Sequence, residues 1–528
     1  MQHQPSHRAQ IITAARRWLT AENVAFAALC TTAVMTTDHG MTDPHITAQN
    51  AYAALMASVL LAVLCAKIVM GKDISLHHSQ LATIFTAVCL CEAAMAFWNE
   101  GFNTTMGGTK GHFDNPAGFA ACMSCGFAIA AHRAAQVQPL MRRCTWAAVA
   151  AALLAGTVLS GCRSGMVACG AVTAALCLIK APRRHRPVVA MAVAAIAVAA
   201  AIALYHIKPA SADGRVLIWQ ATLDMISQKP LLGWGAGAFK AHYMDFQAAR
   251  LTAHHDAAAA MLADNVPFAY CEYLNLAACY GLAGIAALAA GVWWLIVKHR
   301  QAPTPHKACA LLTLLAIGAF SLTSYPTAYA VTQVAMLMSL TPFVSIGKGI
   351  PKAALIAACC CAAIGLAANG LRISALHKWG RLSQSAPTRN VLNGYAQLTA
   401  TLGDDPYFLY NYAVMQLDAG KTDEALQTAE KCSTHWADYD LELLLADIHS
   451  ARHNTAQAIA HYRKAGEMCP NRFVPPYELM QIYATSGNRA MACRYAHLIT
   501  TKPIKVDSPT VQQIIGDARS LLHAPTGK

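Results

Sequence analysis

The sequence predicts an all-α protein: a polytopic membrane helix bundle of about 11 spans, followed by a soluble α-solenoid. Three observations support this fold class. Of the 528 residues, 56% are hydrophobic and only 13% are charged, whereas a soluble protein carries about 25% charged residues. Apolar stretches recur throughout residues 1–371, and residues 372–528 have an ordinary soluble composition with a helical repeat. The composition excludes an ordinary cytosolic enzyme and a disordered chain, which needs low hydrophobicity.

The spans are predicted from apolar length, since a spanning helix needs about 20 mostly apolar residues. The fifth and sixth stretches form a tight hairpin broken at residues 160–165. The approximate cores of the spans are Glu22 to Thr37, Ala51 to Met70, Leu81 to Trp98, Ala117 to Ala135, Thr145 to Ser160, Met166 to Ile179, Pro187 to Tyr205, Leu274 to Val297, Ala308 to Thr323, Tyr329 to Ile346 and Ala353 to Leu371.

The distribution of Lys and Arg predicts the orientation. With a cytoplasmic N-terminus, the cytoplasmic segments hold about 17 of these residues and the opposite loops about 7, as the positive-inside rule expects. An odd number of spans then places everything after Leu371 outside the cytoplasm. The net charge of +13 therefore reflects orientation, and nucleic-acid binding is not predicted, because that needs basic residues grouped on one folded surface.

The chain is expected to have two domains. Residues 1–371 form the membrane domain, which includes a long extracytoplasmic loop at residues 206–270, and residues 372–528 form the tail. Small residues repeat in the tail, with Ala425, Ala458 and Met491 spaced by 33. The pattern resembles a tetratricopeptide repeat (TPR), in which small residues let two helices cross and Pro ends the second helix. The matching positions are Ala458, Tyr462, Ala465 and Pro470, then Met491, Tyr495, Leu498 and Pro503. This resemblance implies a protein or peptide partner for the tail; the alternative is that the repeat stack merely caps a domain.

Two arginines on the extracytoplasmic side are the main candidates for chemistry, since charge at membrane depth is costly and often functional. Arg163 lies at the outer tip of the hairpin, and Arg215 begins the segment that ends at Trp219. Paired guanidiniums suit a phosphate or pyrophosphate; the alternative is that each marks a helix end by snorkelling. The glycines of residues 233–237 follow no strand, so they do not form a dinucleotide loop. They would let the backbone turn tightly beside a substrate or the membrane.

Several short elements together resemble the bacterial O-antigen ligase and O-antigen polymerase superfamily. These elements are residues 160–165, 215–219 and 230–235, together with 111–118 and 324–326. The resemblance covers roughly residues 20 to 350. A TPR tail on such a domain is similar to bacterial versions that include protein O-oligosaccharyltransferases.

The resemblance implies glycan transfer at the periplasmic face of the bacterial inner membrane, with the TPR domain in the periplasm. The donor would be an undecaprenyl-pyrophosphate-linked glycan, and the acceptor lipid A-core, another glycan or a protein hydroxyl. Arg163 and Arg215 match the two arginines that hold the donor pyrophosphate. No metal or other cofactor is expected, and the 19 cysteines and 22 histidines show no zinc-binding spacing.

The sequence departs from the family at the general base. Ligases carry His-Asn before a Gly-x-x-Gly, but here Tyr270-Cys271 precedes residues 281–284. Glu272 and His254 (with His255) are the alternative bases. The structural alternative is that Glu272 only stabilises the fold and that the two His side chains are solvated. The residues predicted to bind substrate are Lys110, Asn115, Trp219, Gly233, Gly235 and Glu92. The structural alternatives are that Asn115 only forms a loop turn and that Glu92 is the buried partner of a structural Arg.

A second hypothesis is a non-catalytic, membrane-anchored TPR scaffold for an envelope complex. The Tyr270-Cys271 departure favours it, whereas the retained arginines favour the enzyme.

Overall fold

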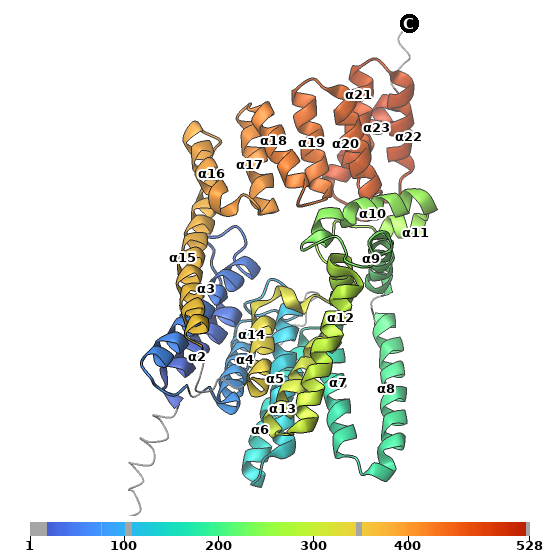
Figure 1. Ribbon diagram of the computed structural model, residues 1–528. Coiled ribbons are helices and arrows are strands. Elements are labelled where there is room, and N and C mark those ends of the chain that lie inside the picture. The colour runs from blue at the N-terminus through green and yellow to red at the C-terminus, as the bar shows by residue number, and fades with distance from the viewer. Residues whose placement is uncertain (1–17, 75, 101–107, 208, 345–350, 524–528) are drawn as a thin grey trace, which may run out of the picture. The chain divides into compact units, whose positions relative to one another are not determined.

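The computed structural model describes residues 18–74, 76–100, 108–207, 209–344 and 351–523 (Figure 1). These residues form helices and no strand, which confirms the all-α prediction. The α-helices described before the tail are α2 Ala21–Met35, α3 Ile46–Val69, α4 His78–Glu100, α5 Pro116–Gln136, α6 Leu140–Leu159, α7 Arg163–Lys180, α8 Arg186–Ile207, α9 Pro209–Gln228, α10 Ala238–His254, α11 Ala257–Leu262, α12 Glu272–Gln301, α13 Pro305–Phe320, α14 Ala330–Leu340 and α15 Lys352–Leu382.

Each predicted span core coincides with one of these helices, although the end of the tenth, at Ile346, lies outside the described residues. Five of the helices, α3, α4, α7, α12 and α15, are long and apolar enough to cross a membrane by length and composition. Helices α2, α13 and the stretch at 330–343 are apolar but shorter. The chain thus has the helices of a multi-pass membrane protein, and the count of eleven spans stays a prediction.

The chain divides into two compact units that differ from the expected domains. The first comprises Met1–Leu204 and Leu288–Arg381, and the second Tyr205–Ala287 and Leu382–Lys528. The long loop expected at 206–270 thus packs with the tail, because its apolar face is buried there. The tail unit starts at Leu382 rather than at residue 372, because α15 continues as one helix to that residue.

Helix α5 is the centre of the first unit and packs against α4, α6, α7 and α13. Almost every side chain from Gly118 to Ala130 is buried. Small residues make this possible: a Cβ on Gly126 would lie 3.0 Å from Cys89 Cβ and from Leu153 Cδ1. Close approach through Gly, Ala, Ser and Cys is typical of helix packing in membranes.

The second unit combines α9–α11 and the start of α12 with the tail helices. The tail helices are α16 Arg389–Leu402, α17 Pro406–Asp418, α18 Thr422–Ser433, α19 Tyr439–Ala451, α20 Thr455–Met468, α21 Val474–Thr485, α22 Arg489–Thr501 and α23 Pro509–His523. Helices α17/α18, α19/α20 and α21/α22 pack in pairs, each pair contacts the next, and α23 packs on α22. Gly420 and Gly487, with φ of 75° and 77°, make the turns of the first and third pairs.

The buried positions of the first two pairs are those predicted, whereas the third pair is shifted by one residue. Ala425 and Ala458 are fully buried. In α22 the buried residues are Ala492, Ala496 and Ile499, while Met491 is only half-buried. Helix α22 starts one residue later than a strict spacing of 33 requires, so the neighbouring side chain faces the core. Assignment of these pairs to the TPR class stays a prediction.

Candidate functional site

In the first unit, the motif elements at 111–118 and 324–326 meet at Asn115. Its Oδ1 caps α5 by accepting a hydrogen bond from the Ala117 backbone N–H at 2.8 Å. Its Nδ2 donates to the Tyr325 hydroxyl, and the Tyr329 hydroxyl donates to Oδ1, both at 3.1 Å. The protein itself therefore engages both ends of the Asn115 amide, as the loop-turn alternative requires. A contact between Asn115 and substrate stays a prediction.

The hairpin element at 160–165 lies beside the 324–326 element in the same unit. Ser164 Oγ lies 2.8 Å from Thr323 Oγ1, next to the 324–326 element. Gly108 has a φ of 69°, and a Cβ there would lie 2.2 Å from the Ser160 carbonyl oxygen, so only glycine fits. Arg163 is half-buried and is the first residue of α7. Its charge therefore lies at the N-terminal end of a helix, where the backbone dipole also favours anions.

Glu92 is buried in α4, with none of its surface exposed. Its Oε1 accepts a hydrogen bond from the His112 backbone N–H at 2.8 Å, and its Oε2 lies 2.7 Å from His112 Nδ1. A Cβ on Gly111 would lie 2.1 Å from Glu92 Oε1. The Glu92 carboxylate thus holds the loop that leads to Asn115. Glu92 therefore positions the 111–118 element. Lys110, in the same loop, is exposed.

In the second unit, Arg215 lines a cavity of about 230 Å³. Helix α9 supplies Arg215, α10 supplies Gln247, and the segment after α11 supplies Asp264 and Tyr270. The Arg215 guanidinium carbon lies 5.4 Å from the centre of the Tyr270 ring, within the range of a cation–π contact. We call this cavity the Arg215 pocket.

The groups of the Arg215 pocket have fixed charge states near neutral pH. Burial raises the pKa of Tyr270, and nearby Arg215 only partly offsets this, so the hydroxyl stays protonated. Burial also raises the pKa of Asp264, but a 2.8 Å hydrogen bond from Arg472 and nearby Lys505 outweigh burial and lower it. One turn along α9 from Arg215, the buried Trp219 indole N–H has no hydrogen-bond partner in the described part of the chain. The pocket therefore combines a cation, an ionised carboxylate and a phenolic donor, with an unpartnered indole donor nearby.

The glycine motif at 233–235 docks on a kink in α12. Gly281 has a φ of 60° and a ψ of −155°, which interrupts the helix. The backbone N–H groups of Trp234 and Gly235 donate to the carbonyls of residues 278 and 279, at 3.0 and 2.8 Å. A Cβ on Gly233 would lie 2.4 Å from the Cys279 carbonyl carbon. The glycines are thus explained by close backbone contact, and a role for Gly233 and Gly235 in substrate binding stays a prediction.

Tail residues hold the loop that lines the Arg215 pocket. Gln247 is 1% exposed, and its Nε2 donates to the carbonyls of Asp264 at 3.0 Å and Met468 at 2.8 Å. Asn471 is 5% exposed, and its Nδ2 donates to the carbonyls of Ala260, at 3.1 Å, and of Met261 and Ala263. The wall of the pocket is therefore set by bonds between segments more than 200 residues apart.

The structure brings together only some of the residues predicted from the sequence. Arg163 belongs to the first unit and Arg215 to the second. His254 is exposed at the C-terminal end of α10, and Glu272 begins α12 and accepts from Asn275 Nδ2 at 3.4 Å. Neither is among the residues that line the Arg215 pocket.

Sequence reasoning missed Gln247, Asp264 and the role of Tyr270 in this pocket. The departure at Tyr270-Cys271 was the available signal, because the resemblance implied a His-Asn pair at that position.

Comparison with known proteins finds a family similarity over part of the chain. Residues 148–265 match the sequence family described as O-Antigen ligase. The matched segment contains Arg163, Arg215, Trp219 and the 233–235 glycine motif. None of the curated proteins compared with the chain matches it. The family match supports the O-antigen ligase superfamily, and with the apolar helices it indicates a multi-pass membrane protein of a glycan-transferring ligase type.

Proposed function

We propose that the protein transfers a glycan from undecaprenyl pyrophosphate to an acceptor at the periplasmic face of the inner membrane. The observation that carries the proposal is that the O-Antigen ligase match contains both arginines, one at a helix N-terminus and the other in a pocket beside Tyr270. Bacterial location, a cytoplasmic N-terminus and a periplasmic tail are parts of the proposal.

In the proposed reaction, the acceptor hydroxyl oxygen attacks the anomeric carbon of the glycan, and the bond from that carbon to the pyrophosphate oxygen breaks. The electron pair of this bond leaves with the polyprenyl pyrophosphate, and a base takes the hydroxyl proton. Arg163 and Arg215 neutralise the charge that grows on the leaving group, as preorganised cations do in a water-poor site. The Tyr270 hydroxyl and the Trp219 indole N–H are further donors on the Arg215 side. No metal is needed in this scheme, and Glu272 and His254 remain the candidate bases.

The proposal is tested by Arg163→Ala and Arg215→Ala in cells, with membrane insertion checked in parallel. Each should reduce glycan transfer by about 100-fold or more, the usual cost of losing one preorganised donor. Arg250→Ala is the matched control: Arg250 lies in the same loop but pairs with Asp224 at 2.7 Å. Arg215→Lys should recover little activity, since Lys lacks the planar fork. Wild-type transfer in both alanine variants would refute the proposal.

The acceptor class is resolved by comparing a deletion strain with its parent. Unmodified periplasmic proteins would indicate an O-oligosaccharyltransferase, and loss of long-chain lipopolysaccharide a lipid A-core ligase. A change in chain length alone would indicate a polymerase. If the tail on a foreign membrane anchor restores the lost phenotype, the scaffold alternative holds instead.

A further inference from the structure

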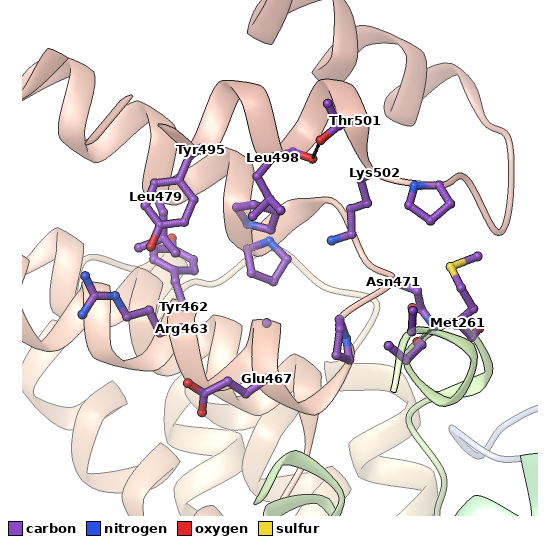
Figure 2. A pocket seen from close by; sticks show the side chains of 17 residues that line it. Met261, Tyr462, Arg463, Glu467, Asn471, Leu479, Tyr495, Leu498, Thr501 and Lys502 are labelled. Atoms are coloured by element: carbon purple, nitrogen blue, oxygen red, sulfur yellow. Dashed lines mark hydrogen bonds between the residues drawn. The ribbon is translucent and has the colours of Figure 1, made fainter. Parts of the chain in front are cut away.

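The second unit contains a larger cavity than the Arg215 pocket, of about 600 Å³. Figure 2 shows the side chains that line it. Helices α20, α21 and α22 form most of it, and α11 closes one end. We call it the α20–α22 cleft. Its volume is in the range of cavities that bind drug-sized ligands or short peptide segments.

The cleft is lined mainly by apolar groups. Its walls hold Tyr462, Leu479, Tyr495 and Leu498 together with the prolines at 470, 475, 476 and 503. Proline has no backbone N–H, so these four positions add no backbone hydrogen-bond donors to the walls. A sugar bound here would leave several hydroxyl groups without partners, which is costly. The lining therefore suits apolar side chains of a polypeptide better than a glycan.

The charged groups of the cleft favour a carboxylate. Lys502 extends into the cavity (Figure 2). Its Nζ donates to the Arg472 carbonyl at 2.6 Å. Arg463 donates to the Tyr483 hydroxyl at 2.9 Å. Neither cation forms an ion pair within the described part of the chain, and Glu467 is the one acidic residue of the lining. Burial lowers the pKa of Lys502 to about 8, and an incoming carboxylate would restore its full charge.

The cleft shares a wall with the Arg215 pocket. Ala257, Ala260 and Met261 of α11 face the cleft, and residues 262–264, which follow directly, line the Arg215 pocket. Asn471 lines the cleft and donates to carbonyls on both sides of this boundary. A polypeptide in the cleft would thus lie next to the pocket in which we place the donor pyrophosphate.

We propose that the α20–α22 cleft binds an extended apolar segment of the acceptor polypeptide, with a carboxylate of that segment on Lys502. This inference rests on the proposed glycan transfer, and it selects a protein as the acceptor.

Binding is tested with the purified full-length protein in detergent, without a glycan donor. The probes are two pools of hexapeptides with random apolar residues around a fixed central Asp or a fixed central Asn, and retention is measured by mass spectrometry. Wild-type protein should retain the Asp pool about tenfold better, the difference expected of a charge-assisted hydrogen bond. Lys502→Gln should abolish that preference.

Gly466→Leu fills the cleft and should reduce retention of both pools. A Cβ on Gly466 meets only Pro475 Cβ, at 3.5 Å, so the backbone of α20 tolerates a side chain there. Gly516→Leu is the matched control, because Gly516 is also helical and a Cβ there meets nothing within 4 Å. Equal retention of the two pools by wild-type protein would overturn the inference, as would displacement of the peptides by maltohexaose or unchanged retention in Gly466→Leu.

Failure of this inference can be told apart from failure of the proposed function. Arg215→Ala should leave peptide retention unchanged. If peptides are not retained but transfer depends on Arg215, only the cleft assignment is wrong. If peptides are retained as expected but transfer depends on neither Arg163 nor Arg215, the glycan-transfer proposal is wrong.

Discussion

Asn471 provides the sharpest test of how the tail holds the Arg215 pocket. Its Nδ2 donates to three carbonyls at the end of α11, and the residue is 5% exposed. Helix α11 has six residues, too few to be stable without tertiary contacts. Asn471→Asp keeps the size of the side chain but replaces its donors with a charged oxygen that faces those carbonyls.

The size of the expected change in local opening follows from the loss of these hydrogen bonds. Leaving a buried polar group unsatisfied costs about 1–3 kcal/mol, and every 1.4 kcal/mol is about tenfold in an equilibrium. Local opening of residues 256–266 should therefore become about 5- to 150-fold more frequent. Hydrogen exchange of this segment, followed by mass spectrometry, measures that change directly.

Asn488→Asp is the matched control, because the same substitution there should leave the folded state almost unaffected. Asn488 caps α22 through its oxygen, which accepts from the Met491 N–H at 3.1 Å. Asp caps a helix about as well as Asn, so exchange should barely change. Wild-type protection of 256–266 in Asn471→Asp, or equal acceleration in both variants, would refute the role assigned to Asn471.

Three further variants test other features of the structure. Burial raises the pKa of Asp438 to about 6. The folded state therefore keeps a proton that the unfolded chain releases near pH 4. As a result, the free energy of unfolding falls as the pH rises from about 4 to about 6. Asp438→Asn keeps the cap of α19 and should raise the free energy of unfolding by up to about 3 kcal/mol at pH 7, with no gain near pH 4 in thermal denaturation. Gly281→Ala should destabilise the second unit by at least about 1–3 kcal/mol from backbone strain, whereas Gly291→Ala, with open space around it, should leave the melting temperature unchanged. Asn115→Ala removes the α5 cap and should cost about 1–2 kcal/mol, measured by thermal unfolding in detergent; an unchanged melting temperature would contradict the capping role.

The sequence predicts the helices well because their signal is local. Each apolar stretch carries its own length and composition, and all of them coincide with helices. The first two tail pairs follow their repeat for the same reason. The third is displaced because its register is set by the start of α22, where Asn488 caps the helix one residue later than the repeat predicts.

The arrangement of the candidate site is less predictable, because it depends on contacts between distant segments. Gln247 and Met468 are 221 positions apart, and neither carries a motif. The glycines at 233–235 look alike whether they face a substrate or a helix, and only the kink at Gly281 explains them. Asn115 likewise lies in a family-like motif, yet its amide caps a helix and bonds two tyrosines.

The packing of loop and tail also changes how the scaffold hypothesis must be tested. Met244 and Ala248 of the loop share a buried cluster with Ala465 and Met468 of the tail. A tail expressed without residues 205–287 would expose that apolar face and leave the Met468 carbonyl without its Gln247 donor. Its failure to function could then reflect misfolding instead of missing catalysis. The transplant must therefore carry residues 205–287 together with 382–528. It lacks Arg163, so a transferase would stay inactive in it, whereas restoration of the phenotype would support the scaffold.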